Sequence, residues 1–423
     1  MTQIKGFKAV YYDKEKAGDL SAVVCPPYDV ISAKEQTEFY NASPHNFIRI
    51  DLGQEKSGDD RYDNKYTRAR KTFDEWLAKG ILKEDTKPCI YFYKQEYMVY
   101  GQKHSRMGFI ALLRLPDEKD SKIYPHENTH LAAKEDRLRL VRNVKASLSS
   151  IFVCFSDKGK KVETTFNQKV VLTVPLIDIV DNDKVRHILW RLDDQMLINE
   201  IRDSLSEQQL FIADGHHRFE VAMEYRRQVL AKKSRPTGLE PCNFIMTYFT
   251  NIDSRDLLIL PIHRIVKKIK GKLDFLEDYF RIDKISSKED LQILLAKAGQ
   301  NEHAFGFYSK NGIKLLRLKN KLLINQHMKE GSQDYKELDA AILKCFVFDR
   351  ANISSDDIIY SKDIGESFNA VDNKQADACF ILNPVRIWQL KAIALNGEKM
   401  PPKTTYFYPK VLSGLTTYRM DSK

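Results

Sequence analysis

The alternation of apolar and polar residues along the chain predicts a mixed α/β protein. In some stretches the apolar residues recur every three or four positions, as on one face of a helix, and in others they alternate or form the short runs typical of strands. In the first part of the chain this pattern predicts helices at 33–43, 62–77, 132–144 and from about 216 onward, and strands at 46–52, 89–93, 108–115 and 210–213.

A lysine-rich run at 267–272 predicts a linker or an exposed edge. We therefore expect an N-terminal catalytic region over 1–266 and a C-terminal α+β region over 267–423. In the C-terminal region Asn311 and Gly312 supply the residues that a tight hairpin turn requires. The elements predicted there are a serine-capped helix at 287–298 and strands at 280–285, 304–308, 314–318, 356–360 and 377–382.

Composition narrows the class of protein. With 423 residues, 43% hydrophobic and 30% charged, the chain resembles a soluble globular protein of two or three domains. No run approaches the roughly 20 apolar residues of a membrane span, and we expect no signal peptide. Six scattered cysteines without a C-x-x-C pair favour free thiols in the cytoplasm. The net charge of +10 is dispersed and no nucleic-acid-binding module is recognisable, so we expect a small anionic substrate.

The most informative stretch joins the strand at 210–213 to the helix that follows it. The residues at this junction are Asp214, Gly215, His216, His217 and Arg218. At a helix N-terminus the backbone N–H groups and the positive end of the helix dipole attract anions. Gly215 permits close backbone approach, and the guanidinium fork of Arg218 matches phosphate. The sequence predicts a phosphate cradle; the competing interpretation is an ordinary turn and a solvated helix start.

A second candidate site begins at His126. Together with Glu127 and His130 it forms the H-E-x-x-H pattern of zinc proteases, which requires a helix to place both imidazoles on one face. Pro125 and the polar flanking residues disfavour a helix there, so a zinc protease is not the preferred interpretation.

The same block has a second interpretation as a phosphate site. On the helix predicted at 132–144, Lys134 and Arg137 lie three positions apart and share a face. With His126 they would form a basic wall, while Glu127 would bind Mg²⁺ or accept a proton. The competing interpretation is a solvated basic helix.

Two further segments carry candidate ligands. Pro26 and Pro27 fix the backbone and hold Tyr28 and Asp29 in a defined orientation. On the predicted strand at 46–52, Arg49 is a candidate anion ligand, although a polar strand face is usually only solvent-exposed. The tail at 400–410 combines prolines, aromatic residues and spaced lysines, which suits either a phosphate-binding flap or docking for stability alone. The candidate ligands of this tail are Lys403, Thr404, Thr405 and Lys410.

Four blocks, taken in order, resemble the signatures of one bacterial family. They read Cys-Pro-Pro-Tyr-Asp-Val, Pro-His-Glu-Asn-Thr, Ala-Asp-Gly-His-His-Arg and Met-Pro-Pro-Lys-Thr-Thr-Tyr-Phe-Tyr-Pro-Lys. From about Phe7 to Leu415 the chain resembles the domain-of-unknown-function 1015 family, whose members include pyrophosphate-dependent L-serine kinases. The third block also resembles the phosphate loops of sulfiredoxins and free serine kinases, which implies a ParB/sulfiredoxin-like catalytic core. The family pattern does not require a second histidine, which makes His130 incidental.

The resemblance implies transfer of a phosphoryl group from pyrophosphate to the hydroxyl of free L-serine, with Mg²⁺ as the cofactor. Asp29 is then the first choice for the base, with Asp214 and Glu127 as alternatives and as metal ligands. The expected substrate-binding residues are Tyr28, Arg49, Thr404 and Thr405. The expected phosphate ligands are Gly215, His216, His217, Arg218, His126, Lys134, Arg137, Lys403 and Lys410.

Two other classes of function stay open at this point. The first is a small-molecule kinase of the same superfamily that uses ADP or ATP as donor. The second is a non-enzymatic, ParB-like nucleotide-binding regulator, which is disfavoured because no DNA-recognition helix is evident in the sequence.

Overall fold

The computed structural model describes residues 2–117, 121–129 and 131–421. They form two compact units: one comprises the described parts of Met1–Pro125, Thr129–Leu257 and Pro409–Lys423, and the other comprises His126–Asn128 and Leu258–Tyr408. Each unit combines helices with a sheet, which confirms the mixed α/β class. His130, the last residue of the H-E-x-x-H pattern, lies outside the described residues.

The boundary between the units differs from the one expected after Val266. Strand β14 (His263–Val266) pairs with β18 (Ile358–Ser361) and β19 (Ala378–Ile381), so it belongs to the sheet of the second unit. The lysine-rich run at 267–272 is an irregular loop that follows β14 within that unit. The residues from Pro409 onward belong to the first unit.

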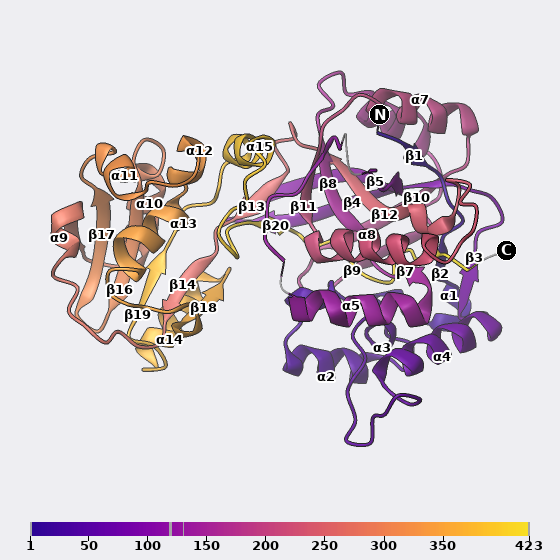
Figure 1. Ribbon diagram of the computed structural model, residues 1–423, viewed down its shortest axis with the longest axis horizontal. Coiled ribbons are helices and arrows are strands. Elements are labelled where there is room, and N and C mark those ends of the chain that lie inside the picture. The colour runs from indigo at the N-terminus through magenta and orange to yellow at the C-terminus, as the bar shows by residue number, and fades with distance from the viewer. Residues whose placement is uncertain (1, 118–120, 130, 422–423) are drawn as a thin grey trace. The chain divides into compact units, whose positions relative to one another are not determined.

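The first unit is built on a nine-stranded mixed sheet (Figure 1). Its strands follow the order β6 (Ile123–Tyr124), β11 (Leu210–Asp214), β8 (Ile151–Phe155), β12 (Phe244–Asn251), β5 (Gln102–Arg114), β4 (Ile90–Val99), β10 (Arg186–Leu192) and β9 (Ile177–Val180), while β1 (Ile4–Lys5) pairs with β5. The pairs β6–β11 and β8–β12 are parallel and the others are antiparallel. The predicted strands at 89–93, 108–115 and 210–213 are confirmed, but β4 and β5 extend further than expected.

Both faces of the sheet centre are buried, which is why its strands read as nearly continuous apolar runs. Phe92, Phe109 and Phe249 belong to a core shared with α6 (Lys161–Thr165) and α7 (Gln195–Leu205). Because neighbouring residues of a strand face opposite sides, the residues between them form the other face. That face carries polar and aromatic side chains, among them Tyr93, Gln95, Arg106, Phe152 and Tyr248.

Helices cover the sheet of the first unit in successive layers. Helix α8 (His216–Leu230) packs against α5 (Leu131–Val144), and α5 packs against α4 (Lys65–Ala78) (Figure 1). These three helices confirm the predicted amphipathic stretches. The smaller elements of this unit are α1 (Lys14–Ala17), α2 (Ala33–Ala42), α3 (Ile48–Asp51), β2 (Val10–Tyr12) paired with β3 (Leu82–Glu84), and β7 (Ala146–Ser147) paired with β21 (Tyr418–Arg419).

The strand predicted at 46–52 is wrong, because this segment forms the short helix α3. The side chain of Asn46 is buried and accepts a hydrogen bond from the Ile48 N–H at 2.9 Å, which turns the chain into the helix. The amide nitrogen of Asn46 donates to the carbonyls of Ala22 and Val24. These long-range contacts override the alternating pattern of the sequence.

The second unit contains a six-stranded sheet in the order β15 (Phe280–Ile285), β17 (Gly312–Leu318), β16 (Ala304–Ser309), β19, β14 and β18, and a two-stranded sheet of β13 (Leu258–Leu260) with β20 (Tyr406–Tyr408). The predicted strands of this region are confirmed, except that the one at 356–360 begins two residues later, after a 3₁₀ turn. Helix α10 (Lys288–Ala298) is capped by Ser287 as expected. The remaining helices are α9 (Leu276–Tyr279), α11 (Leu322–His327), α12 (Gln333–Lys336), α13 (Asp339–Leu343), α14 (Ile364–Asp372) and α15 (Ile387–Leu395).

Composition predicted free cysteines and the absence of a membrane-spanning segment, and the structure bears on both expectations. All six cysteines are free, and all but Cys345 are buried. Among the described residues, no helix combines the length and the apolar character that crossing a membrane requires.

The sheet of the first unit leaves no room for a side chain at Gly108. A Cβ atom there would lie 2.2 Å from the carbonyl oxygen of Phe249 and 2.6 Å from the ring of Tyr248. We expect Gly108→Ala to lower the free energy of unfolding by about 3 kcal/mol or more, because the obstacle is backbone in the neighbouring strand. Urea denaturation measures this change. Gly58→Ala, which meets no atom within 4 Å, is the control, and equal midpoints for the two variants would contradict the argument.

Candidate functional site

The stretch predicted to be a phosphate cradle lies at the junction of β11 and α8. Gly215 lies between them with φ of +86°, a left-handed conformation that favours glycine. A Cβ atom at this position would come within 3.0 Å of both the Ile151 side chain and Nε of Arg218. No side chain caps the N-terminus of α8, and His216, its first residue, is buried. The local sequence therefore places a 15-residue helix with its positive end at this junction.

Asp214 lies between two cations at the start of this helix. Nη2 of Arg218 donates to Oδ2 of Asp214 at 2.6 Å, and the ammonium of Lys410 donates to Oδ1. The Arg218 guanidinium also donates to the carbonyl of Ser150 at 2.6 Å. Only 10–11% of each of the three charged side chains is exposed. The formal charge of these three side chains together is +1, before the nearby carboxylates of Asp29 and Asp51 are counted.

Several carboxylates stabilise the charged form of Arg218. Burial alone would lower the pKa of its guanidinium, but the negative charges of Asp214, Asp29 and Asp51 outweigh this and raise the pKa above its ordinary value. Arg218 is therefore a permanent cation at the site.

The Pro26-Pro27 segment presents Tyr28 and Asp29 next to these charges. Pro27 precedes a 3₁₀ turn over Tyr28–Val30, and Asp29 is exposed at its surface. Among the described residues no hydrogen bond or ion pair engages the Asp29 carboxylate. Burial raises the pKa of the Tyr28 hydroxyl, and the charge of Asp29 raises it further, so Tyr28 is a neutral donor. Asp29 is thus an available carboxylate within the electrostatic range of Arg218.

Arg137 is close to this loop but is held by other groups. Its guanidinium lies over the Tyr28 ring at 4.2 Å and donates to the backbone carbonyl of Asp51 at 2.5 Å. Two further nitrogens donate to Asp136, at 2.5 and 2.8 Å. Asp51 in turn accepts a hydrogen bond from the hydroxyl of Ser413 at 2.9 Å. Arg137 thus links the Tyr28 loop to α3 and to the end of the chain.

Two other predicted cations have partners of their own. Lys134 donates to Glu220 of α8 at 3.0 Å, and the hydroxyl of Thr129 donates to the same carboxylate at 2.6 Å. Arg49, on α3 rather than on the expected strand, donates to the carbonyl of Tyr40 at 2.5 Å at the end of α2. Its guanidinium also lies 4.4 Å from the centre of the Tyr40 ring. To bind a substrate carboxylate, as expected from the sequence, Arg49 would have to give up its contact with the C-terminal end of α2.

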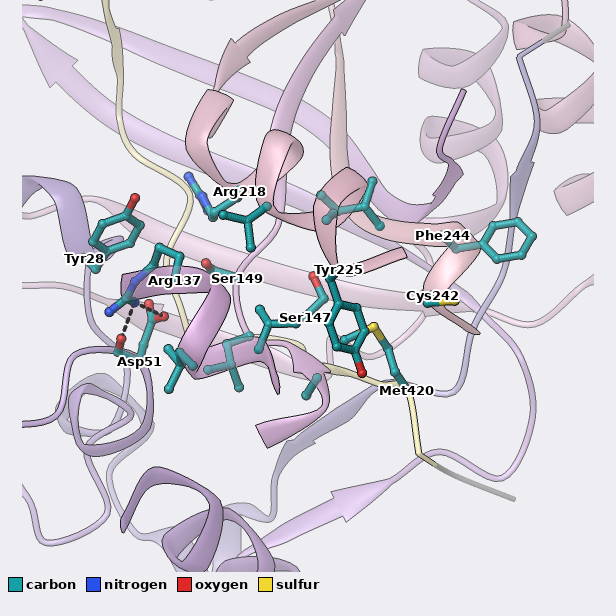
Figure 2. A pocket seen from close by; sticks show the side chains of 17 residues that line it. Tyr28, Asp51, Arg137, Ser147, Ser149, Arg218, Tyr225, Cys242, Phe244 and Met420 are labelled. Atoms are coloured by element: carbon teal, nitrogen blue, oxygen red, sulfur yellow. Dashed lines mark hydrogen bonds and ion pairs between the residues drawn. The ribbon is translucent and has the colours of Figure 1, made fainter. Parts of the chain in front are cut away.

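A cavity of about 60 Å³ begins next to Arg218 (Figure 2). Tyr28, Asp51 and Arg137 lie at one end, and Tyr225, Cys242 and Met420 lie at the other (Figure 2). Its walls come mainly from the facing sides of α5 and α8 and are mostly apolar. By volume such a cavity accommodates a few water molecules or a small aliphatic group.

In the second unit the structure brings two other predicted blocks together. His126 is buried, and its Nε2 lies 3.2 Å from the hydroxyl oxygen of Thr405. The Met400 N–H donates to the His126 carbonyl at 2.8 Å, and Glu127 forms an isolated bridge with Met400. This segment is extended rather than helical, so it lacks the helix on which a zinc protease would place its two imidazoles.

The turn before Thr405 orients Lys403. Its backbone adopts φ of +54°, and its carbonyl accepts a hydrogen bond at 3.0 Å from Arg264, which is buried in β14. Thr404 is buried and donates to the Pro401 carbonyl at 2.5 Å. The hydroxyl of Thr404 thus shapes the turn.

Sequence reasoning missed the groups that hold these motifs in place. Asp51, Asp136 and Ser413 carry no local signal, since each gains its role from residues distant in the chain. Gln95 and Arg106 lie just beyond the ends of the predicted strands. Arg106 lies two residues before the strand predicted at 108–115, and extending that strand toward the N-terminus would have included it.

The expected Mg²⁺ was assigned to Asp214 and Glu127. Within the described ranges, no three His, Cys, Asp or Glu side chains cluster as a metal site. Both oxygens of Asp214 already face cations, so this carboxylate does not fit a resident Mg²⁺ in the arrangement observed.

The Asp136 cluster makes stability depend on pH. Burial alone would raise the pKa of Asp136, but Arg137 and then Lys65 and Tyr66 lower it to about 2. A depressed pKa in the folded state stabilises the protein above pH 4, and this stabilisation is lost as the pH falls toward 2. Because 26% of the side chain is exposed, we expect Asp136→Asn to cost about 1–2 kcal/mol at pH 7.

Urea denaturation at pH 7, 4 and 3 measures this dependence. The deficit of Asp136→Asn should shrink as the pH falls, because protonated Asp136 resembles asparagine. The exposed Asp183→Asn is the control, and a deficit that is constant with pH would refute the assignment.

Comparisons with solved structures yield remote matches only. A conserved hypothetical protein from Pyrococcus furiosus is 14% identical, with a TM-score of 0.36 over 74% of this chain and 96% of its own. A free serine kinase in complex with AMP is 15% identical, with a TM-score of 0.35 over 70% and 86%. SbnI with C-terminal truncation from Staphylococcus aureus is 11% identical, with a TM-score of 0.35 over 72% and 85%. At these TM-scores the matches carry no argument about function.

No curated protein matches the chain. A family model, described as a protein of unknown function (DUF1015), matches residues 4–341, which contain three of the four sequence blocks and both halves of the β11–α8 junction. The chain therefore belongs to the DUF1015 family.

Proposed function

We propose that this protein is a kinase that transfers a phosphoryl group from pyrophosphate to the hydroxyl of free L-serine, giving O-phospho-L-serine. The observation that carries the proposal is the cluster at the N-terminus of α8. There Arg218 and Lys410 share one carboxylate, and the exposed Asp29 carboxylate lies within electrostatic range. The resemblance of the four sequence blocks to pyrophosphate-dependent serine kinases supports the choice of donor and acceptor.

The donor would bind through its phosphate oxygens. The excess positive charge at Asp214 and the positive end of α8 both attract an anion. Arg218 has five N–H groups, of which the contacts with Asp214 and Ser150 use only part, so others can donate to phosphate. Asp214 would then act by keeping Arg218 and Lys410 oriented.

In the transfer step the serine hydroxyl oxygen attacks the terminal phosphorus of pyrophosphate. A new O–P bond forms, the bond from phosphorus to the bridging oxygen breaks, and its electron pair leaves with inorganic phosphate. Asp29 would position the hydroxyl and accept its proton. Such transfers need positioning and charge stabilisation more than a strong base. Asp29 suits this role better than Asp214, whose two oxygens are held by cations.

Mg²⁺ would arrive with the donor. Because Mg²⁺ is usually held by substrate phosphates and only one or two carboxylates, magnesium pyrophosphate is the expected substrate species. No step described above is routed through a resident metal.

The remaining predicted ligands divide into two groups. Lys134 and Arg137 are held by Glu220 and by Asp136 and Asp51, so we assign them to the framework of the site. His126, Lys403 and Thr405 lie in the second unit, and their expected role as ligands stays a prediction from the sequence.

Phosphorus NMR of the purified protein tests the function directly. L-serine and Mg²⁺ are supplied with pyrophosphate, ADP or ATP in separate samples. We expect the phosphoserine signal with pyrophosphate only. A product formed from ADP or ATP alone would overturn the donor, and no product from any donor would overturn the kinase assignment and favour a nucleotide-binding regulator.

The assignment of Asp29 predicts the behaviour of one variant. Asp29→Asn keeps the shape of the side chain but removes its charge and its capacity to accept a proton. We expect kcat to fall by about a hundredfold or more, with little change in the free energy of unfolding, because Asp29 is exposed. Asp183→Asn serves as the control. If Asp29→Asn retains a near-normal kcat, the base is another group.

A further inference from the structure

A buried polar pair lies in the sheet beneath the end of the chain. Gln95 of β4 and Arg106 of β5 are directly opposite each other in the antiparallel register, and both are 0% exposed. A guanidinium nitrogen of Arg106 donates to the Gln95 side-chain oxygen. The guanidinium also lies 4.7 Å from the ring centre of Phe152 and 5.7 Å from that of Tyr248. A fully buried arginine is costly, so its contacts must be well satisfied.

Both side chains also bind the strap, by which we mean Pro409–Ser413. Nη2 of Arg106 donates to the carbonyl of Pro409 at 2.5 Å, and Nε2 of Gln95 donates to the carbonyl of Lys410 at 2.8 Å. Two consecutive carbonyls of the strap are therefore fixed to the sheet. The side chain of Lys410 extends from this fixed backbone to Asp214.

The other end of the strap is held separately. Ser413 and Cys25 exchange backbone hydrogen bonds at 2.8 and 3.2 Å, and the Ser413 hydroxyl donates to Asp51. These contacts fix the strap three residues beyond Lys410. The contacts from Gln95 and Arg106, in contrast, act directly on the carbonyl of Lys410 and on that of the preceding Pro409.

We propose that Gln95 and Arg106 are positioning residues for Lys410. By holding the carbonyls of Pro409 and Lys410 they place the ammonium at Asp214, where it is available to the donor phosphate. A lysine side chain is flexible. The position of its ammonium group therefore depends on how firmly its backbone and its ion pair are held. The part that concerns the donor phosphate rests on the proposed function, whereas the placement of Lys410 does not.

The reactivity of the Lys410 amine tests its placement without any assay of activity. The protein is treated with an amine-acetylating reagent, and the rate of modification of Lys410 is followed by peptide mass spectrometry. Arg106→Lys keeps the charge, but it removes Nη2, the one nitrogen that donates to both Gln95 and Pro409, and replaces it with a shorter side chain. We expect Lys410 to react about tenfold faster in this variant, because the strap opens more often when the hydrogen bond from the Arg106 guanidinium to the Pro409 carbonyl is lost.

The matched control is Arg226→Lys. Arg226 is another largely buried arginine that donates to two backbone carbonyls, those of Leu115 and Pro116, but it does not contact the strap. We expect Lys410 reactivity to be unchanged there. Circular dichroism shows whether Arg106→Lys folds. If it does not, the reactivity of Lys410 is measured instead in Gln95→Leu, which retains Arg106 but loses the hydrogen bond to the Lys410 carbonyl. Wild-type reactivity of Lys410 in the folded variants would overturn the proposal.

Kinetics separate this proposal from the proposed function. Arg106→Lys should lower kcat/KM for pyrophosphate, leave KM for L-serine unchanged, and have no further effect when Lys410 is already replaced in Lys410→Met. Equal losses in the two backgrounds would mean that Arg106 acts through the general fold. If the wild-type protein transfers no phosphate at all, the proposed function fails, and the reactivity of Lys410 still decides whether Gln95 and Arg106 position it.

Discussion

The site in the first unit depends on one carboxylate that two cations share. Asp214 accepts hydrogen bonds from Arg218 through one oxygen and from Lys410 through the other. Without this carboxylate, two cations would face each other where little solvent reaches them, and charges in such places are weakly screened. The shared ion pair therefore joins β11, α8 and the strap, and its three side chains together carry a formal charge of +1.

The contacts that complete the site join residues far apart in the chain. Lys410 and Asp214 are separated by 196 positions, Arg106 and Pro409 by 303, and Ser413 and Asp51 by 362. Ordering such long loops is costly in entropy, so these contacts form only when the rest of the first unit supports them. The β11–α8 junction is a local motif, but the second cation beside Asp214, Lys410, comes from a distant part of the chain.

This separation explains what the sequence could and could not predict. The β11–Gly215–α8 junction, the Ser287 cap and the hairpin at Gly312 follow from local chemistry, and each was found. Arg49 was placed on a strand because its neighbours alternate, whereas the buried side chain of Asn46 turns the segment into a helix. The roles of Gln95 and Arg106 do not follow from their positions beside predicted strands, because these roles depend on strand register and on a tail some 300 residues away.

The carboxylates near the site differ in environment rather than in residue type. Asp214 accepts hydrogen bonds from two cations, and Asp51 accepts one from the hydroxyl of Ser413, so the oxygens of both carboxylates are engaged within the protein. Asp29 is exposed on a turn that Pro27 begins, and no such partner engages it among the described residues. Environment alone can give two carboxylates different roles. In the proposed function this difference is the reason for giving Asp214 the orientation of the cations and Asp29 the contact with the acceptor hydroxyl.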